Sequence, residues 1–165
     1  MKLHNPYFPA LCSTFPHIIL LFTVTLLCLQ PATSTALTNE TDRLALLKFK
    51  ESIVDDPYGI LSSWNDSIQF CNWYGVTCGR CHQRVTALEL QGHNTLGGEI
   101  PASLANCTKL RVMTIAWKKL IGTIPRELGS LSKLLYFRVA INNLTGGIPP
   151  FLGNLSFLEI FFGIL

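Results

Sequence analysis

The sequence has little charge, few histidines and no apolar run of membrane-spanning length. Charged residues make up 14% of the 165 positions, with 13 Lys and Arg against 10 Asp and Glu, a formal net charge of +3. So small a balance argues against a nucleic acid or another long polyanion as the partner. No run reaches the roughly 20 apolar residues that a membrane-spanning helix needs. The hydrophobic content of 48% at this low charge argues against disorder.

Catalytic motifs are also absent from the sequence. There is no nucleophile elbow, no His-x-x-x-His metal motif and no phosphate-binding loop. After residue 36 the histidines are His82 and His93, and neither has a neighbouring acid in the pattern of a catalytic pair. The scattered acids are Glu89, Glu99, Glu127 and Glu159. We therefore predict that the chain is not an enzyme and uses no cofactor.

The amino terminus has the three-part layout of a secretory signal peptide. A basic start at Lys2 precedes an apolar run over 18–29 and then a stretch of small residues that ends at Ala36. We predict a signal peptide over 1–36, cleaved after Ala36, with Ser34 as the second choice and an uncleaved signal anchor as the alternative. The product is expected in the secretory pathway and then outside the cell or at its surface.

Five Asn-x-Ser/Thr sequons occur along the chain. Each is an acceptor for an N-linked glycan if the chain enters the secretory route. Five sequons, each lying after the predicted signal peptide, favour an extracellular glycoprotein. The predicted glycosylation sites are Asn39, Asn65, Asn106, Asn143 and Asn154.

A helix is predicted at the start of the mature chain. Leu44, Leu47 and Ile53 recur at the spacing of one helical face. Thr41 is the expected N-cap, because a Ser or Thr side chain there accepts a hydrogen bond from the first turn. Turn-forming residues follow, so the helix is expected to end near Val54.

From Val85 onward the sequence repeats itself with a period of 24 residues. A period of this length marks a solenoid, in which each unit buries its apolar face only by stacking on its neighbours. Within a unit, apolar residues alternate as in a short strand with one buried face, at Leu110, Met113 and Ile115 and again at Leu134, Phe137 and Val139. The columns in phase are Leu96, Leu120 and Leu144; Gly98, Gly122 and Gly146; Ile100-Pro101, Ile124-Pro125 and Ile148-Pro149; Leu104, Leu128 and Leu152; and Leu110, Leu134 and Leu158.

The repeat resembles the plant-specific class of leucine-rich repeat, and Leu144-x-Gly-x-Ile-Pro149 is the specific part of the match. With the helix at Asp42-Arg-Leu-Ala-Leu-Leu and the Trp64 to Cys78 segment, the chain resembles the N-terminal ectodomain of plant leucine-rich-repeat receptor-like kinases and receptor-like proteins. The resemblance covers 40–165. It implies an α/β solenoid, a right-handed superhelix with short parallel strands on its concave face and a helical, disulfide-stapled cap.

The resemblance also divides the chain into parts. It implies an N-terminal cap over 37–84, stapled by a disulfide between Cys71 and Cys78, and leucine-rich repeats over 85–165. The repeat units are 85–108, 109–132, 133–156 and a partial unit 157–165.

The sequence departs from this pattern in three places. Lys118 stands where the asparagine that links successive turns is expected, as at Asn142. The first unit has one extra residue, which predicts a small bulge over His93–Thr95. The apolar segment 157–165 has no polar cap, which predicts marginal stability and association.

The remaining cysteines allow several interpretations. Cys107 shares a column with Leu131 and Leu155, so we expect a buried apolar thiol. Cys81 is then expected to remain unpaired. Cys78-Gly-Arg-Cys81-His82 fits the haem-attachment pattern, and a zinc site with Cys71 is a further alternative, but an oxidising compartment favours disulfides.

The outward strand positions are the predicted binding surface, because the resemblance implies that the concave face reads a ligand or co-receptor. Trp117, Tyr136 and Arg138 are the favoured contacts, since these residue types dominate binding hot spots. The expected ligand is a peptide, a glycan or a partner ectodomain, and a co-receptor is possible. The alternatives are a fragment of a receptor serine/threonine kinase, an inhibitor of extracellular hydrolases, and a gene remnant without function. The predicted surface comprises Glu89, Gln91, Arg111, Thr114, Ala116, Trp117, Tyr136, Arg138 and Ala140.

Overall fold

The computed structural model describes residues 32–90 and 96–163, and the side chains from residue 39 onward. The predicted signal peptide and the bulge at His93–Thr95 lie outside these residues, apart from 32–36, so both stay predictions. The helix and strands in chain order are α2 (Ala32–Ser52), β1 (Ile53–Asp55), β2 (Val76–Cys78), β3 (Val85–Glu89), β4 (Gly97–Glu99), β5 (Val112–Thr114), β6 (Lys119–Ile121), β7 (Tyr136–Arg138) and β8 (Ile160–Phe162). Short 3-10 helices are η1 (Phe70–Asn72), η2 (Ala102–Asn106), η3 (Arg126–Ser130) and η4 (Pro150–Asn154).

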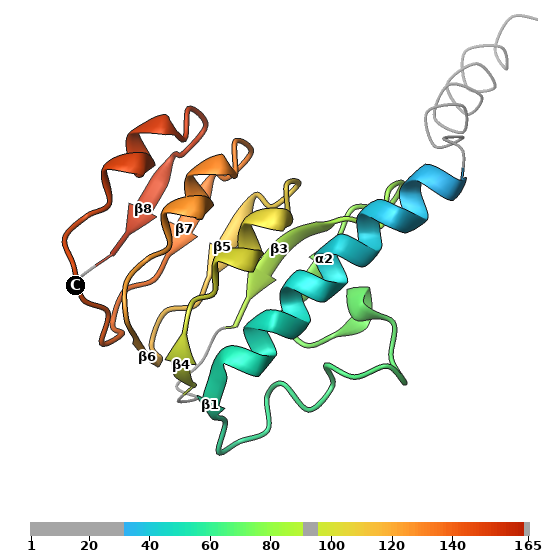
Figure 1. Cartoon of the computed structure of the whole chain (residues 1–165), viewed down its shortest axis with the longest axis horizontal. Helices are drawn as coiled ribbons and strands as arrows, with labels where there is room; N and C mark the ends of the chain where they lie inside the picture. Colours follow the sequence, from blue (N-terminus) through green and yellow to red (C-terminus); the bar gives the residue numbers. More distant parts are fainter. Residues whose placement is uncertain (1–31, 91–95, 164–165) are drawn as a thin grey trace, which may run out of the picture. The chain divides into compact units, whose positions relative to one another are not determined.

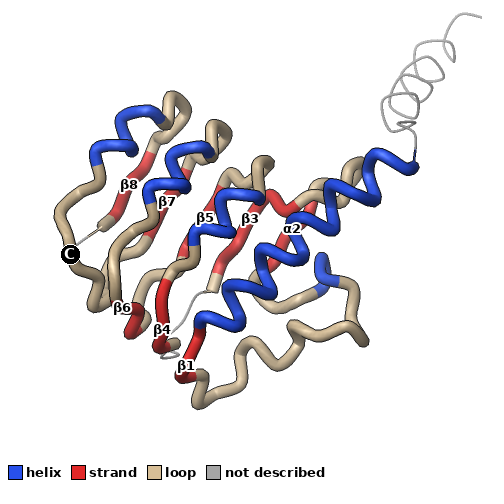
Figure 2. The backbone as a smooth tube through the Cα atoms, viewed as in Figure 1, coloured by secondary structure: helices blue, strands red, loops and turns tan. Residues whose placement is uncertain are grey.

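The strands form two sheets, of which the larger runs the length of the repeats and the smaller ends at β6. The larger sheet has the order β2-β3-β5-β7-β8, with β2 antiparallel to β3 and all later neighbours parallel. The smaller sheet has the order β1-β4-β6. In Figure 1 the parallel strands follow one another side by side, and each repeat crosses to a short helix before it returns to the sheet. Figure 2 shows the same strand, loop and helix alternation in each unit.

The strand register shows the extra residue that the sequence predicts in the first unit. Val112 pairs with Tyr136, and Tyr136 pairs with Ile160, so these units are 24 positions apart. Ala87 pairs with Val112, which is 25 positions later. The first unit is therefore one residue longer than the next two, as the sequence predicts.

The predicted buried face of the strands is confirmed. Leu110, Met113 and Ile115 are at most 1% exposed, and the matching residues of the next unit are fully buried. In the cap, Trp64 and Trp73 stack with ring centroids 5.4 Å apart and are both buried. The indole nitrogen of Trp64 donates a hydrogen bond of 2.9 Å to the carbonyl of Tyr74, so its polar edge is satisfied inside the core.

The helix starts earlier than the sequence pattern predicts, so Thr41 is not its N-cap. Helix α2 begins at Ala32, and neither Gly nor Pro occurs between Ala32 and Thr41 to stop it. It ends at Ser52, two residues before Val54, because Ile53–Asp55 pairs as strand β1 with β4. At this crossing a Cβ on Gly98 would meet the carbonyl oxygen of Ser52 at 2.2 Å, so the close approach requires glycine.

The cysteines follow the prediction with one exception. Cys71 and Cys78 form the predicted disulfide, with Cα atoms 5.5 Å apart. Cys107 is a free thiol, 1% exposed, and burial raises its pKa, as expected for a thiol that serves as a small apolar side chain. The prediction that Cys81 stays unpaired is wrong, because Cys81 is disulfide-bonded.

The apolar columns become less buried along the solenoid. Ile100 and Ile124 are 3% and 6% exposed, whereas Ile148 in the same column is 67% exposed. Phe157 and Phe162 are also more than half exposed. The last described residues therefore expose apolar side chains, and association through them stays a prediction.

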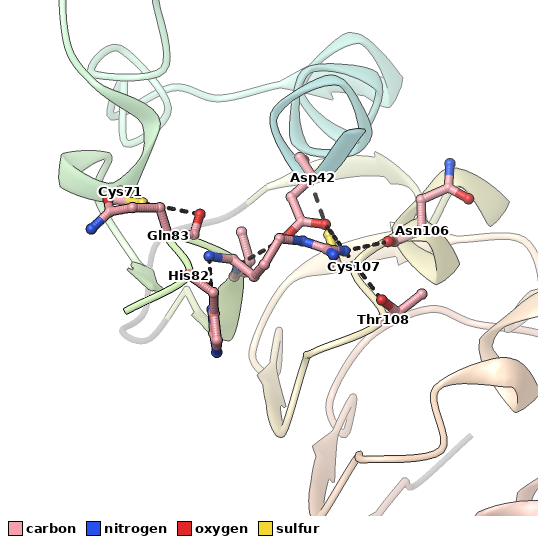
Figure 3. A network of polar contacts seen from close by, with 9 residues as sticks. Asp42, Cys71, His82, Gln83, Asn106, Cys107 and Thr108 are labelled. Atoms are coloured by element: carbon pink, nitrogen blue, oxygen red, sulfur yellow. Dashed lines mark hydrogen bonds and ion pairs between the residues drawn. The ribbon is translucent and has the colours of Figure 1, made fainter. Parts of the chain in front are cut away.

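A buried ion pair joins the cap helix to the first repeat. Arg84 Nε donates to Asp42 Oδ2 at 2.8 Å, and Arg84 Nη2 donates to Asp42 Oδ1 at 2.7 Å. The backbone N–H of Val85, the first residue of β3, donates to Asp42 Oδ2 at 2.8 Å, and Arg84 Nη2 also donates to Thr108 Oγ1 at 3.1 Å. The network in Figure 3 thus ties α2 to the start of β3 and to the loop before β5. Asp42 is fully buried and Arg84 is 8% exposed.

Replacing Asp42 with alanine is expected to lower the free energy of unfolding by about 3–5 kcal/mol, because it leaves the Arg84 guanidinium buried without its counter-charge. Chemical denaturation of the secreted chain, followed by circular dichroism, measures the loss. Glu51→Ala is the matched control, since it breaks an ion pair with Lys48 in which both side chains are more than 60% exposed. That control should cost no more than about 1 kcal/mol, and equal losses in the two variants would show that the buried pair has no special role.

Candidate functional site

The outer face of the larger sheet holds most of the predicted binding residues. Arg111, Trp117 and Arg138 are exposed, and Glu89 and Tyr136 are partly exposed. We call this set the sheet face. Because β3, β5 and β7 are parallel and in register, side chains from three repeats lie next to one another on it. Gln91 lies outside the described residues, so its place in the set stays a prediction.

Thr114 was predicted to be outward and available, but it is only 9% exposed. It pairs with Glu89 on one side and Arg138 on the other, so two longer side chains flank the short one. Ala116 and Ala140 are 6% and 1% exposed and are likewise buried. These small residues form the floor of the sheet face and not its contacts.

Trp117 is held on the surface by an uncommon backbone conformation. Its φ is +62°, in the left-handed region, and Ile141, one repeat later, has a φ of +57°. The N–H of Trp117 donates to the carbonyl of Ala140 at 3.0 Å, and the N–H of Lys118 donates to the carbonyl of Ile141 at 3.1 Å. These bonds hold the chain reversal after β5, which leaves the indole 52% exposed. Because Ile141 has the same conformation one repeat later, the left-handed φ belongs to the geometry of the repeat, and the side chains of both residues are exposed.

Tyr136 is positioned by an acid from the neighbouring strand. Its hydroxyl donates to Glu159 Oε2 at 3.0 Å, and this hydrogen bond raises the pKa of Tyr136. The phenol is therefore neutral at physiological pH and oriented across the gap between β7 and β8. The hydrogen bond thus fixes the orientation of the Tyr136 ring on the sheet face.

Asn142 confirms the turn-linking role that the resemblance implies. Its Nδ2 donates to the carbonyls of Ile115 at 2.9 Å and Val139 at 2.7 Å, and its Oδ1 accepts from the N–H of Leu120 at 3.2 Å. One amide thus joins two successive repeats beneath the sheet face. Lys118 occupies the equivalent place one repeat earlier. It is 4% exposed, and burial lowers the pKa of its amine, partly offset by the charge of Asp56.

A groove lined by cations crosses the other end of the parallel strands. Its volume is about 650 Å³, and no acidic residue lines it. Lys109, Arg111 and Lys133 come from the segments just before β5 and β7, while Arg80 and His82 come from the cap loop after β2. We call this the basic groove, defined by Arg80, His82, Lys109, Arg111, Lys133 and Phe157.

Of the groove residues, the sequence predicts only Arg111 as a binding residue, and it assigns Arg111 to the sheet face. Lys109 and Lys133 are 24 positions apart, so the repeat column was a usable signal for both. Arg80 and His82 lie in the cap, outside any column, and only the folded structure brings them beside the repeats. The sheet face and the basic groove meet at Arg111, at the amino ends of the strands.

The electrostatics of the basic groove are unbalanced. The positive charge of Lys133, and then a hydrogen bond with it, lowers the pKa of Lys109. Burial lowers the pKa of His82, and the charges of Lys109, Arg84 and Lys133 lower it further. His82 is therefore neutral at physiological pH, and its Nδ1 accepts from the N–H of Arg84 at 3.2 Å.

Metal and haem alternatives lose their ligands in this structure. Cys71 and Cys78 are bonded to each other, so neither offers the thiolate that zinc binding or haem attachment requires. Among residues 32–90 and 96–163, no group of three His, Cys, Asp or Glu side chains is arranged to hold a metal ion. Across the same two ranges, no helix has the length and hydropathy to cross a membrane.

The predicted glycosylation sites differ in accessibility. Asn106, Asn143 and Asn154 are exposed in the repeats. Asn39 lies within α2 and is partly buried. Asn65 is partly buried, and its Nδ2 already donates to the carbonyl of Ser62 at 2.9 Å. All five stay predictions, and the three repeat sites are the more accessible ones.

Comparison with known proteins confirms the leucine-rich-repeat resemblance. Residues 39–79 match the family described as leucine rich repeat N-terminal domain. The chain is 55% identical over 73 residues to a probable LRR receptor-like serine/threonine-protein kinase of Arabidopsis thaliana, a match that covers 44% of this chain and 7% of that protein. The chain therefore spans a small part of the length of that relative.

Solved structures of plant ectodomains have the same fold. The BIR2 ectodomain from Arabidopsis thaliana superimposes with a TM-score of 0.65 at 36% identity, over 71% of this chain and 63% of that one. The LRR ectodomain of the plant membrane receptor kinase GASSHO1/SCHENGEN3 from Arabidopsis thaliana, in complex with CASPARIAN STRIP INTEGRITY FACTOR 2, gives 0.62 at 34% identity, over 69% of this chain and 14% of that one. The predicted solenoid with a disulfide-stapled cap is confirmed.

Lys118→Asn is expected to raise the free energy of unfolding by about 0.5–2 kcal/mol at neutral pH, because it places an amide in the turn-linking column and removes a buried amine. Burial lowers the pKa of Lys118 from 10.5, so between the lowered pKa and 10.5 the unfolded chain binds more protons than the folded one. The stability of the unmodified protein therefore rises with pH through that window. The advantage of the variant should shrink from pH 7 toward pH 10, as denaturation at several pH values measures.

Lys119→Asn is the control, since Lys119 is exposed on the neighbouring position. Its effect on stability should be small and independent of pH. A loss of stability in Lys118→Asn at every pH would contradict the prediction.

Proposed function

We propose that this chain, a leucine-rich-repeat N-terminal cap followed by leucine-rich repeats of the plant ectodomain type, binds an extracellular peptide or partner ectodomain on its sheet face. The observation that carries the proposal is an exposed tryptophan shortly after β5, Trp117, and an exposed arginine in the neighbouring parallel strand β7, Arg138. Both residue types concentrate binding energy when a partner covers them.

The sheet face has the rigidity that a binding surface needs. Its floor is made of buried small residues, Thr114, Ala116 and Ala140, so the larger side chains stand on a packed base. The Asn142 amide and the backbone bonds of Trp117 fix the strand ends from below. Little side-chain and loop order is lost on binding when the surface is preorganised in this way.

Relatives support this assignment over an enzymatic one. One structurally similar ectodomain was solved in complex with CASPARIAN STRIP INTEGRITY FACTOR 2, which makes a proteinaceous ligand the first class to test. The receptor kinase relative matches this chain over 7% of its own length, so its kinase activity does not transfer to these residues. We infer a non-catalytic role for the chain.

The extracellular location is part of the same proposal. The signal-peptide layout at the amino terminus, the Cys71–Cys78 disulfide and the exposed sequons support it. The disulfide closes a short loop that carries the stacked cap, and it is stable in an oxidising compartment. Signal perception at the cell surface is the biological role that we propose for the binding.

Selection of displayed random peptides against the secreted chain tests the proposal. Peptides that bind should lose at least about tenfold in affinity against Trp117→Ala/Arg138→Ala, since a truncated hot-spot residue costs about 2 kcal/mol or more. Affinity is measured by surface plasmon resonance with the selected peptides, and folding of each variant is checked by circular dichroism.

The matched control is Tyr58→Ala/Arg126→Ala, which removes an aromatic and an arginine, both exposed, from outside the sheet face. It should change affinity less than about twofold, within the range of near-neutral positions. Selected peptides that ignore the first double variant would overturn the sheet face as the site. A soluble chain that inhibits a cell-wall hydrolase without selecting any peptide would favour the inhibitor alternative.

A further inference from the structure

The basic groove brings four cationic side chains together without an acidic one in its lining. The four are Arg80, Lys109, Arg111 and Lys133. Arg84 differs from these four residues, because it is buried and donates two hydrogen bonds to Asp42. Within the described part of the chain, none of the four groove cations takes part in an ion pair.

Lys109 and Lys133 are the most informative pair. They occupy the same column in successive repeats whose parallel strands lie about 4.8 Å apart, and both line the same groove. The positive charge of Lys133 also lowers the pKa of Lys109. Two like charges at this distance repel each other, and the repulsion costs stability. A bound anion between them relieves that repulsion, which favours the occupied groove over the empty one.

The walls of the groove are not uniformly charged. Phe157 is 62% exposed and Leu135 is partly exposed, and both line the same space. They follow Lys133 toward β8, so the groove is cationic near the cap and apolar at its other end. An occupant that satisfies the whole lining therefore carries both negative charge and a bulky apolar group.

We propose that the basic groove binds a short acidic peptide segment, with carboxylates at the cationic end and a bulky apolar side chain against Phe157 and Leu135. This site is separate from the sheet face and meets it only at Arg111. It would select ligands that carry negative charge. One carboxylate bridges Lys109 and Lys133, and a second accepts hydrogen bonds from Arg111 or Arg80. Arginine suits the second place because its planar donors match a carboxylate in pairs.

A peptide fits these observations better than other anions do. The volume of about 650 Å³ lies within the range of about 300–1,000 Å³ that ligand pockets have, which is room for a short segment and not for a long polymer. A nucleic acid presents a long row of phosphates, whereas the groove offers four cations in a short space. A free inorganic anion or a polyuronic acid leaves Phe157 and Leu135 without a partner.

The spacing between the parallel strands is compatible with an extended peptide. Adjacent strands lie about 4.8 Å apart, and side chains on one face of an extended peptide recur about every 6.6 Å. Lysine has a long flexible arm, which bridges this small mismatch between neighbouring rungs. A peptide laid across the strand ends therefore presents its acidic and apolar side chains to successive repeats.

Fluorescence anisotropy with the secreted chain tests the proposal. The probe is a short labelled peptide with four glutamates and one leucine, and the comparison peptides replace the glutamates with glutamine or the leucine with serine. The glutamate and leucine peptide should bind at least about tenfold more tightly than the glutamine peptide, since hydrogen bonds to charged groups are the stronger ones. Its affinity should fall as salt is raised, because exposed charges are screened.

Two double variants with the same change in net charge separate the groove from the overall charge. Lys109→Gln/Lys133→Gln should weaken the probe at least about tenfold, whereas Lys48→Gln/Lys119→Gln, at exposed positions outside the groove, should change it less than about twofold. Phe157→Ser should erase the advantage of the leucine peptide over the serine peptide. Trp117→Ala/Arg138→Ala should leave probe binding intact, so a failure of the sheet face and a failure of the groove give different results.

Three results would overturn the proposal. Equal weakening by the two lysine variants would mean that only net charge matters. Equal affinity for the leucine and serine peptides would remove the apolar end of the site. Polygalacturonate or inorganic sulfate binding the groove as tightly as the peptide, at equal charge concentration, would assign it to a polysaccharide or a free anion instead.

Discussion

The Asp42–Arg84 pair is the interaction on which the placement of the other elements depends. It takes one residue from the cap helix and one from the start of the first repeat, and it also engages the N–H of Val85 and the hydroxyl of Thr108. Both charged groups are buried, so each is tolerated only in the presence of the other. This reciprocity selects a single docking angle for α2, since any other angle leaves a charge unpaired. The contact fixes the start of β3, and β5 and the later strands pair in parallel with it.

Beyond the cap, backbone and side-chain hydrogen bonds hold each repeat against the one before it. Each parallel strand pairs with its predecessor, and Asn142 reaches two repeats at once. Each unit also covers the apolar columns of the one before it, which is why Ile100 and Ile124 are buried while Ile148 is not. In such a solenoid each repeat contacts only its neighbouring units, so contacts elsewhere in the chain do not compensate for a defect in one repeat. A change in one turn-linking side chain therefore affects a surface directly above it.

The sequence predicted the features that depend on the repeat and missed those that depend on how unlike segments meet. The buried strand faces at Met113 and Phe137 and the disulfide of the cap were predictable, because periodicity and a short cysteine spacing encode them locally. The start of α2 was not, because Thr41 is a good capping residue in a segment that has nothing to stop the helix before it. Thr114 was placed on the correct face, yet neighbouring strands cover it, and no pattern within one strand reports the size of its neighbours.

The basic groove was missed for a related reason. Lys109 and Lys133 share a column, but Arg80 and His82 come from a cap loop that has no periodic signal, and the set exists only once the cap has docked. Whole-chain charge concealed it as well, because acids elsewhere nearly balance the cations. Local charge is thus a better guide to binding than the sum over a chain.

The column that contains Lys109, Lys133 and Phe157 has a consequence for how such a surface changes over evolutionary time. The units 109–132 and 133–156 each contribute two side chains to the groove, Lys109 and Arg111 and then Lys133 and Leu135, and a separate set to the interior. Unequal crossing-over between repeats, or exchange of a repeat between related genes, transposes a groove residue together with the strand that carries it. Exchange of one repeat for another would therefore change the lining of the groove unit by unit, while the apolar columns beneath it keep their pattern.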